Sequence, residues 1–247
     1  MICVVLAAGY ATRLYPLTEN FPKPLLDVNG KSILDWILCD IEKIDEVKSF
    51  VIISNHKFVS HFEKWSKECP LTKPVTVIDD GTTSNDNRLG AVRDIDFAIE
   101  KLGLDDDLLV VAGDNILDFS FDSFVEYFKE KDTSCVMRYF EESKTVLQKC
   151  GVACVDDNGL ITEMEEKPKE PKSNWGIPPF YIYKKEDVHF VRDGIEQGCA
   201  VDAPGSFIAW LCTKTKVYAM EMKGNRYDIG DVASYEQVKK DFKGIIY

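Results

Sequence analysis

A loop of small residues near the start of the chain is followed by two cations suited to phosphate chemistry. The apolar residues 3–7 lead into Ala8-Gly9-Tyr10-Ala11-Thr12, then Arg13 and later Lys23. Small side chains let backbone N–H groups approach phosphate oxygens, and an arginine can donate two parallel hydrogen bonds to a phosphate. The loop has neither GxGxxG nor P-loop spacing, so alone it also suits a tight turn with a solvated arginine.

Two aspartates far apart in the sequence are candidate ligands for a divalent cation. Asp114 follows the apolar residues 107–112, and Asp228 stands in Asp228-Ile229-Gly230-Asp231. Protein carboxylates commonly bind Mg²⁺ in ones or twos, with waters and phosphate oxygens as the other ligands. Each aspartate also has a structural explanation as a turn or cap residue, although Asp231 is better placed to cap the last helix.

A charged segment in the second half, Glu165-Glu166-Lys167-Pro168, is a further candidate. On composition alone, a solvated loop is the better interpretation, because charge runs usually face solvent. No Ser/His/Asp or Cys/His arrangement indicates a nucleophile. The histidines fall in segments with helical patterns and are not expected to be catalytic: His56, His61 and His189.

Composition excludes several classes of protein. The net charge is −12, and no run of Lys and Arg forms the basic patch of a nucleic-acid binder. No apolar run is long enough to span a membrane. The eight cysteines form no CxxC pair and favour reduced core thiols in a cytoplasmic protein. Zinc at Cys150 and Cys154 is disfavoured, because a tetrahedral site needs further ligands.

The first half of the sequence alternates predicted strands with predicted helices. The strands are 3–7, 49–54, 75–78 and 107–112, and the helices are 32–44, 57–69, 89–102 and 121–131. This order predicts an α/β fold with a parallel sheet covered on both faces. Ligands bind at the carboxyl ends of such strands, so the loops after Ala7, Ser54, Ile78 and Ala112 should line the site.

The second half changes character. Its predicted strands are 134–140, 151–155, 160–164, 178–183 and 217–222, and its predicted helices are 185–197, 206–213 and 232–242. Asp157-Asn158-Gly159 predicts a hairpin turn. No repeat or long linker separates the halves, so we expect one domain over 1–247.

Taken together, these motifs resemble the sugar-phosphate nucleotidyltransferase family. That family opens with L-A-(A/G)-G-x-G-(T/S)-R-L-x-P-x-T, then K-P-L-(L/V)-P-V and a further Lys. The matching residues are Leu6, Ala7, Ala8, Gly9, Thr12, Arg13, Leu14, Pro16, Thr18, Lys23, Pro24, Leu25, Leu26, Val28 and Lys31. Ala11 replaces the second family glycine and Asp27 a proline, and neither change removes a charged group.

The resemblance continues through the chain. Gly113-Asp114-Asn115 and Asp228-Ile229-Gly230 match the two family aspartates that hold Mg²⁺. Gly90-Ala91 matches a helix opening near the nucleotide base, where Arg88 stands in place of a glutamine of some relatives. Gly151-Val152 and Glu166-Lys167-Pro168 match the segments that meet the sugar and its phosphate.

The resemblance implies a single Rossmann-like domain with a mostly parallel mixed central sheet flanked by helices, and no C-terminal β-helix. Residues 1–131 would bind the nucleotide and 132–247 the sugar phosphate. The implied nucleotide-binding residues are Leu6, Ala7, Ala8, Gly9, Tyr10, Ala11, Thr12, Arg13, Lys23, Asp79, Arg88, Gly90 and Asp114. The implied sugar-phosphate residues are Asn115, Gly151, Glu166 and Lys167, and the metal ligands are Asp114 and Asp228.

The implied activity joins a nucleoside triphosphate to a sugar 1-phosphate, or a similar phosphorylated small molecule, with Mg²⁺ and release of pyrophosphate. Arg13, Lys23, Asp114, Lys167 and Asp228 would be catalytic, in a cytoplasmic monomer or homodimer with no nucleic-acid or membrane partner. The base and sugar stay open, although the 202–205 segment resembles the heptose, mannose and N-acetylmuramic acid branches more than the thymidylyltransferases.

Two other functions remain as alternatives. A glycosyltransferase that uses a nucleotide-sugar should carry D-x-D after a central strand, whereas Asp105-Asp106-Asp107 precedes the predicted strand. A regulatory protein that binds a nucleotide-sugar without catalysis is expected to lose the loop arginine or a metal aspartate. This chain retains Arg13, Asp114 and Asp228.

Overall fold

The computed structural model describes residues 1–247, and its contacts divide the chain into two compact units. Unit 1 contains Met1–Arg88, Ala112–Asp122 and Lys223–Tyr247, and unit 2 contains Leu89–Val111 and Ser123–Met222. The units do not coincide with the predicted halves 1–131 and 132–247, because the chain passes between them more than once. That they form one domain stays a prediction.

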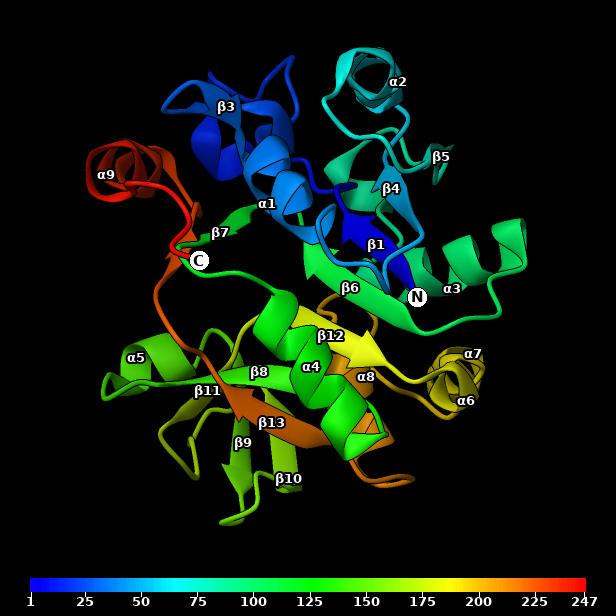
Figure 1. Ribbon diagram of the computed structural model, residues 1–247, viewed down its shortest axis with the longest axis vertical. Coiled ribbons are helices and arrows are strands. Elements are labelled where there is room, and N and C mark those ends of the chain that lie inside the picture. The colour runs from blue at the N-terminus through cyan, green and yellow to red at the C-terminus, as the bar shows by residue number, and fades with distance from the viewer. The chain divides into compact units, whose positions relative to one another are not determined.

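Unit 1 contains a parallel sheet in the order β1 (Ile2–Leu6), β4 (Ser49–Ser54) and β5 (Val75–Asp79). Helix α2 (Val59–Glu68) packs against β4 and β5 (Figure 1). The centres of β1 and β4 are fully buried, which explains why these strands are continuous apolar runs rather than alternating ones. The predicted strands and their parallel arrangement are confirmed here.

Helix α1 (Ile33–Ile41) begins at a capping box between Ser32 and Asp35. The prediction that this helix reaches residue 44 is wrong. The Ile44 N–H bonds to the Ile41 carbonyl oxygen three residues back, so the chain turns there. Ile44 is nevertheless buried, and its apolar side chain extended the helical pattern beyond the helix itself.

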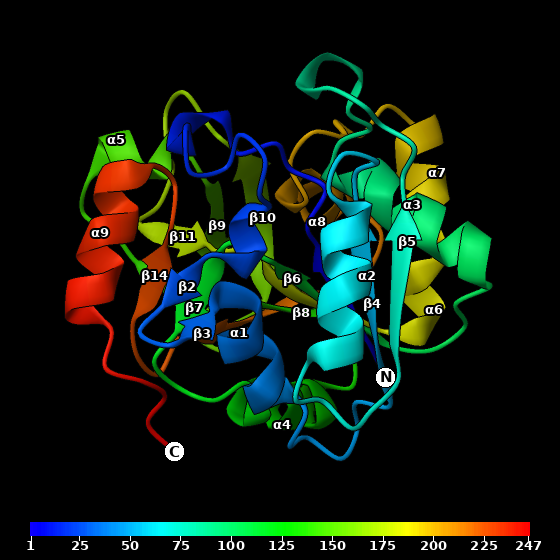
Figure 2. The same cartoon turned by 90° about the horizontal axis from the view of Figure 1, so that it is seen from above.

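Short elements complete unit 1. Strand β7 (Asn115–Leu117) pairs antiparallel with β14 (Arg226–Asp228), and α9 (Val232–Asp241) packs against β14 (Figures 1 and 2). Asp231 caps α9 by accepting a hydrogen bond from the Ser234 N–H at 2.8 Å, which confirms the predicted cap. The remaining elements are η1 (Thr12–Leu14), η2 (Lys23–Leu25), η3 (Asn85–Asn87), β2 (Asp27–Val28) and β3 (Lys31–Ser32).

Unit 2 contains a mixed sheet in the order β10-β9-β11-β8-β12-β6, with β13 also paired to β8. Its strands are β6 (Leu108–Ala112, whose last residue belongs to unit 1), β8 (Cys135–Phe140), β9 (Gly151–Val155), β10 (Ile161–Glu166), β11 (Trp175–Ile177), β12 (Phe180–Tyr183) and β13 (Tyr218–Glu221). Only the β13–β8 pair is parallel; the other pairs are antiparallel. The α/β class and the mixed sheet are confirmed. Strands β1, β4 and β5 of unit 1 pair parallel, whereas most strand pairs of unit 2 are antiparallel.

Helices flank the sheet of unit 2. They are α3 (Ala91–Leu102), α4 (Asp122–Lys131), α5 (Lys144–Leu147), α6 (Lys185–Val188), α7 (Phe190–Glu196) and α8 (Gly205–Leu211). Helix α3 packs on α7, and α8 packs on β10. The prediction of one helix over 185–197 is wrong, because the chain breaks it at His189. His56 likewise lies in the turn before α2 rather than in a helix.

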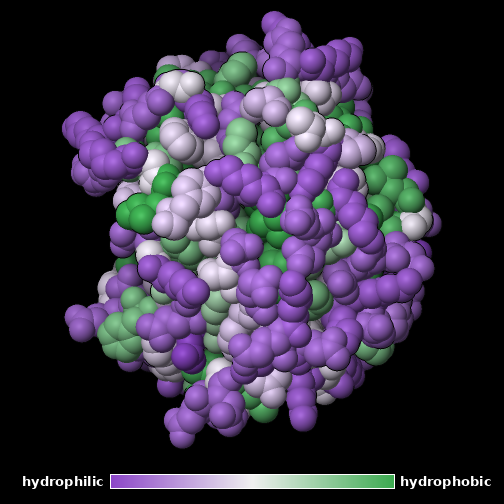
Figure 3. All heavy atoms as spheres, viewed as in Figure 1, coloured by the Kyte–Doolittle hydropathy of each residue, from purple (hydrophilic) through white to green (hydrophobic).

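The face of the protein drawn in Figure 3 is mostly polar, with only small apolar areas between its hydrophilic residues. No helix is long and apolar enough to cross a membrane. Of the eight free cysteines, Cys3 and Cys135 are buried and the others are half-buried, so the prediction of core thiols holds for two of them only.

Candidate functional site

The loop after β1 is fixed from its two sides. Asn55, which follows β4 and is fully buried, donates its Nδ2 to the Ala8 carbonyl oxygen at 2.9 Å. Thr18, also fully buried, donates its hydroxyl to the Ala11 carbonyl oxygen at 2.8 Å. Ala11 takes a left-handed conformation with φ 47°, which a glycine would adopt without strain. The loop therefore has a defined shape without any ligand.

The backbone N–H groups of five consecutive loop residues have no acceptor in the chain. From Gly9 to Arg13 none of these amides donates a hydrogen bond, whereas Ala7 bonds to Ile53 and Leu14 to Ala11. Gly9 is exposed, and a Cβ added to it would meet no atom within 4 Å. Consecutive free amides around a concave turn form an anion-binding concavity. The Tyr10 side chain turns inward against Phe58, so only its backbone faces this region.

Lys23 lies in η2 and bridges two parts of unit 1. Its Nζ donates to Asp114 Oδ2 at 2.7 Å and to the Ile229 carbonyl oxygen at 2.8 Å. Only 11% of its side chain is exposed. In this structure the Lys23 ammonium group pairs with the predicted metal ligand Asp114, and its predicted support of a triphosphate stays a prediction.

The pairing of β7 with β14 explains how Asp114 and Asp228 come together. Asn115 stands opposite Asp228 in the strand register, and the Ile229 N–H donates to the Asp114 carbonyl oxygen at 3.2 Å. Asp228, the last residue of β14, is therefore held beside Asp114, which lies in the turn that precedes β7. The sequence placed both at one sheet edge, but the short antiparallel ribbon that joins them was not predicted.

Asn115 and Arg226 connect the two carboxylates. The Asn115 Nδ2 donates to Asp114 Oδ1 at 2.6 Å, and its Oδ1 accepts from Arg226 at 2.7 Å. The Arg226 guanidinium also lies 3.6 Å from Asp228. Asn115 was predicted to contact the sugar phosphate. Both ends of its amide are engaged in unit 1, where they orient Asp114, and the contact with the sugar phosphate stays a prediction.

The two carboxylates have opposite pKa shifts. Burial opposes ionisation of Asp114, but Lys23, Asn115 and Arg226 together hold its pKa below the usual value. Burial and the charge of Asp114 raise the pKa of Asp228, although Arg226, Lys23 and Arg13 partly offset them. Arg13 itself is exposed. The charge of Asp114 is therefore compensated by Lys23, and the charge of Asp228 is the less compensated of the two.

The donor set of this site fits Mg²⁺. It presents two adjacent carboxylates, and no group of three or more His, Cys, Asp or Glu side chains is placed to hold a metal elsewhere. Mg²⁺ keeps several waters and uses phosphate oxygens, so two protein carboxylates are sufficient. The neighbouring loop of free amides would hold those phosphates.

The residues predicted to lie near the base have other interactions. Asp79 forms a hydrogen bond with His56 Nδ1 at 2.6 Å and accepts another from the Gly81 N–H. Arg88 bonds to the Asn85 carbonyl oxygen at 3.1 Å on an exposed turn. Gly90 in unit 2 has φ 93°, and a Cβ there would lie 2.6 Å from the Val201 carbonyl oxygen. Gly90 therefore has a packing reason to be glycine, and base contacts stay a prediction.

In unit 2, two glycines lie beside a half-buried carboxylate, that of Glu166. Glu166 stands opposite Gly151 in the β10–β9 register. A Cβ on Gly151 would lie 3.0 Å from Glu166 Oε2, and one on Gly205 only 2.1 Å from it. The Tyr181 hydroxyl is 3.4 Å from the same Gly205 position. Burial raises the pKa of Glu166, and Lys167 lowers it in part. Gly205 and Tyr181 were not predicted.

Lys167 follows Glu166 at the end of β10. Its side chain is exposed, its N–H donates to the Cys150 carbonyl oxygen at 3.0 Å, and its φ is 49°. A left-handed lysine is conformationally costly unless the surroundings fix it. The hydrogen bond to Cys150 therefore fixes the backbone of Lys167 on an exposed turn.

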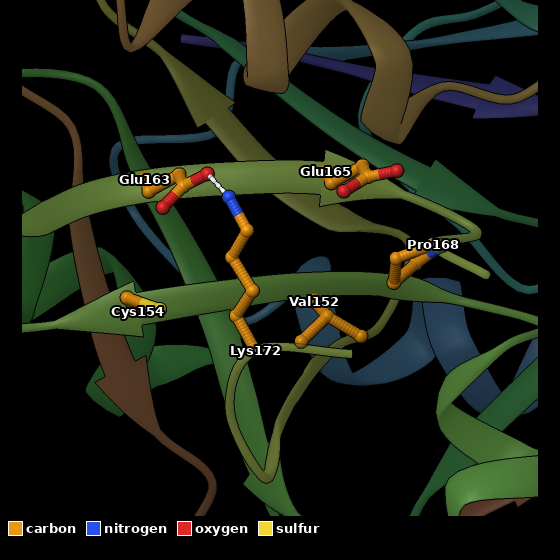
Figure 4. Close-up of a pocket in the computed structure, with 6 residues that line it drawn as sticks. All are labelled: Val152, Cys154, Glu163, Glu165, Pro168 and Lys172. Carbon is orange, nitrogen blue, oxygen red and sulfur yellow. Dashed lines mark hydrogen bonds and ion pairs between the residues drawn. The ribbon is translucent and has the colours of Figure 1, made fainter. Parts of the chain in front are cut away.

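A separate pocket lies on the other face of the same strands. Figure 4 shows Glu163 and Glu165 on β10 beside Val152 and Cys154 on β9, with Lys172 reaching Glu163 in an ion pair. Successive strand residues point to opposite faces, so Glu165 faces this pocket and Glu166 does not. Its acidic lining is unsuitable for a phosphate.

Three positioning residues were missed as site residues. Thr18 was part of the motif match, and Asn55 follows a strand whose loop was expected to line the site. Both are polar and fully buried, a combination that a sequence does not reveal. Arg226 lies two residues before Asp228, and only the β7–β14 pairing gives it a partner.

Comparison with known proteins gives a consistent result. The nucleotidyl transferase family matches residues 2–244. A candidate mannose-1-phosphate guanyltransferase of Sulfolobus acidocaldarius is 28% identical over 246 residues, covering 99% of this chain and 64% of that protein. A UTP–glucose-1-phosphate uridylyltransferase of Haloferax volcanii is 30% identical over 191 residues, covering 76% of this chain and 74% of that protein. The chain thus spans just under two thirds of the first relative's length.

The fold is shared with solved structures. A UDP-glucose pyrophosphorylase complexed with UDP-glucose superposes with a TM-score of 0.79 at 18% identity, covering 97% of each chain. This likeness establishes the α/β architecture with its mixed sheet.

Proposed function

Because the chain belongs to the nucleotidyl transferase family, we propose that it joins a nucleoside triphosphate to a sugar 1-phosphate and releases pyrophosphate. The observation that carries this proposal is the run of free amides from Gly9 to Arg13 in the unit that also holds the Asp114–Asp228 pair. Free amides suit a polyphosphate, and paired carboxylates suit its metal.

Both reactants of this reaction are anions, so catalysis consists mainly of positioning and charge neutralisation. The amides of Gly9 to Arg13 would bind the triphosphate oxygens, and the Arg13 guanidinium would stabilise the charge on the leaving pyrophosphate. An oxygen of the sugar phosphate attacks the α-phosphorus, and the bond to the pyrophosphate oxygen breaks. No covalent intermediate with the protein is needed.

Asp114 and Asp228 would hold Mg²⁺, which supplies Lewis-acid charge stabilisation at the phosphates when bound. Lys23 neutralises Asp114 in the absence of metal, at a distance of 2.7 Å. Asn115 and Arg226 keep the Asp114 carboxylate oriented. Lys23 would also offer its charge to the triphosphate.

The acceptor is proposed to bind to unit 2. The half-buried Glu166 carboxylate, next to Gly151 and Gly205, would accept hydrogen bonds from sugar hydroxyls. The exposed ammonium group of Lys167 would meet the sugar phosphate. The absence of side chains at Gly151 and Gly205 lets this carboxylate lie close to both backbones, at positions that a Cβ would contact.

Pyrophosphate release tests this function directly. The protein is incubated with Mg²⁺ and each of ATP, CTP, GTP, UTP and dTTP against a panel of sugar 1-phosphates. One triphosphate and one acceptor should together release pyrophosphate and form a nucleotide-sugar. If no pair releases pyrophosphate above a protein-free control, the proposed function is wrong.

We also propose a cytoplasmic location, where nucleoside triphosphates are abundant, and action as a monomer or homodimer. Sedimentation velocity with and without a triphosphate distinguishes these two assemblies.

A further inference from the structure

The structure assigns to Asp118 the role of a positioning residue for the aspartate pair, acting through the register of β14 on β7. This inference rests on the proposed function, since it concerns the metal site of the same reaction. Asp118 contributes nothing to the phosphate loop and is not one of the paired carboxylates. Its side chain acts at the opposite end of the ribbon.

The ribbon formed by β7 and β14 is short. It contains the pairs Asn115–Asp228, Ile116–Tyr227 and Leu117–Arg226. Two strands of this length have little stability of their own. A slip of one residue would turn every β14 side chain to the opposite face, which would carry Asp228 away from Asp114.

Asp118 holds the end of the ribbon where β14 begins. Its Oδ1 accepts the Asn225 N–H at 2.7 Å, and its Oδ2 accepts the Asn225 Nδ2 at 2.8 Å. Its own N–H donates to the Asn225 carbonyl oxygen at 3.1 Å. The residue therefore engages the backbone and the side chain of Asn225 together, which defines a single register.

The residue before Asn225 is shaped to admit this carboxylate. A Cβ at Gly224 would lie 2.4 Å from Asp118 Oδ1 and 2.9 Å from the Phe119 ring. Any side chain at residue 224 would push the Asp118 carboxylate off Asn225. Gly224 thus gives a second, independent way to disturb the same contact.

The Asn115–Arg226 link makes the register matter for Asp114 as well. Arg226 lies on β14, and it holds Asn115, which in turn holds Asp114. Displacement of β14 would therefore disturb both carboxylates. A loss of Asp118 should appear as weakened metal binding in a folded protein.

The test compares Asp118→Ala and Gly224→Ala with Asp118→Asn and with the matched control Asp156→Ala. Asp156 is a turn aspartate of unit 2 whose side chain likewise accepts two hydrogen bonds, in its case from the backbone N–H groups of Asn158 and Leu160. Asp118→Asn keeps an acceptor for the Asn225 N–H, and the Asn225 amide can turn to accept from the new amide.

Mn²⁺ binding in the presence of the accepted triphosphate, without acceptor, is measured by electron paramagnetic resonance. Asp118→Ala and Gly224→Ala should weaken Mn²⁺ binding by about tenfold or more, whereas Asp118→Asn and Asp156→Ala should stay within about threefold. In metal-free protein, hydrogen exchange at residues 226–228 should be faster in the first two variants and unchanged in Asp156→Ala.

The outcomes separate this inference from the proposed function. If wild-type protein binds no Mn²⁺, the metal site itself is wrong. If wild-type protein binds Mn²⁺ and folded Asp118→Ala binds it equally well, Asp118 is only a structural turn residue. If Asp118→Ala does not fold, Gly224→Ala and Asp118→Asn decide: equal Mn²⁺ binding in these two overturns the inference, and a tenfold difference supports it.

Discussion

Asp114 and Asp228 are chemically identical and have different surroundings. Lys23 lies 2.7 Å from Asp114, whereas the nearest cation to Asp228 is Arg226 at 3.6 Å. From the sequence, both aspartates were expected to behave as one repelling pair whose neutralisation would not destabilise the metal-free protein. The ion pair between Asp114 and Lys23 changes that expectation. Only neutralisation of Asp228 is now expected to stabilise the metal-free protein.

The metal-free Asp228→Asn variant should be more stable than wild type at neutral pH. The folded state raises the pKa of Asp228 above the unfolded value of about 3.9, so folding favours the protonated carboxyl. The stability that this protonated form gives the wild-type protein is fully present below about pH 3.9 and is lost as the pH rises through the folded pKa. Since 53% of this side chain is exposed and screened by solvent, the gain should be below about 1 kcal/mol. Urea unfolding with a chelator should show the two proteins converging as the pH falls below about 4. A difference that grows on acidification would contradict the assignment.

Arg13→Ala should reduce turnover by about 100-fold or more, because an oriented donor to transition-state charge is lost. Stability should change by less than about 0.5 kcal/mol, since Arg13 is exposed and fills no core position. Steady-state rates and thermal unfolding check the two halves of this prediction. A folded Arg13→Ala protein with the wild-type rate would falsify the assignment of the phosphate loop.

Lys167→Ala should weaken use of the sugar phosphate and leave triphosphate binding almost unchanged. Loss of a charge-assisted hydrogen bond costs about 1.5–3 kcal/mol, which is roughly tenfold or more in apparent affinity. The matched control is Lys169→Ala, another exposed lysine of the same segment. Calorimetry of triphosphate binding without acceptor completes the test. If triphosphate binding collapses, Lys167 belongs to the nucleotide site.

At the scale of elements, the long strands and helices could be predicted and the short ribbon could not. The strands β1, β4 and β6 are continuous apolar runs, and periodicity detects them. Strands β7 and β14 have three residues each, too few for a pattern, and they pair across more than a hundred residues. The motif residues Asp114 and Asp228 could therefore be found, but the contacts that orient them could not.

Gly90→Ala should destabilise the protein by more than about 2 kcal/mol. Its φ of 93° is unfavourable for alanine, and the new Cβ would lie 2.6 Å from the Val201 carbonyl oxygen. Gly103→Ala is the matched control, because Gly103 also has a positive φ but open space around it, and about 1 kcal/mol is expected there. Denaturant unfolding measures both. If the two variants lose equal free energy of unfolding, the close approach of Val201 is not the reason why residue 90 is a glycine.

At the scale of the whole molecule, the α/β class and the family could be predicted from the sequence. The compact units have other boundaries than the predicted halves 1–131 and 132–247, and the roles of those halves stay a prediction. Unit 1 requires segments from the start, middle and end of the chain. Hydrophobic periodicity reports local structure only, and it does not show that residues 223–247 return to unit 1. The triphosphate and metal candidates, from Arg13 to Asp228, consequently all belong to one unit although they span nearly the whole sequence.

The most direct test of the proposed function is a double-mutant comparison of Asp114→Asn and Asp228→Asn in the Mg²⁺-dependent reaction. Chelation by EDTA should stop nucleotide-sugar formation by wild type, and added Mg²⁺ should restore it. Each single variant should lose most of the rate, and the double variant should lose little more, because groups that act as one unit are not additive. Near-normal Mg²⁺-dependent turnover in either single variant, or rate losses that simply multiply in the double variant, would contradict a shared metal site.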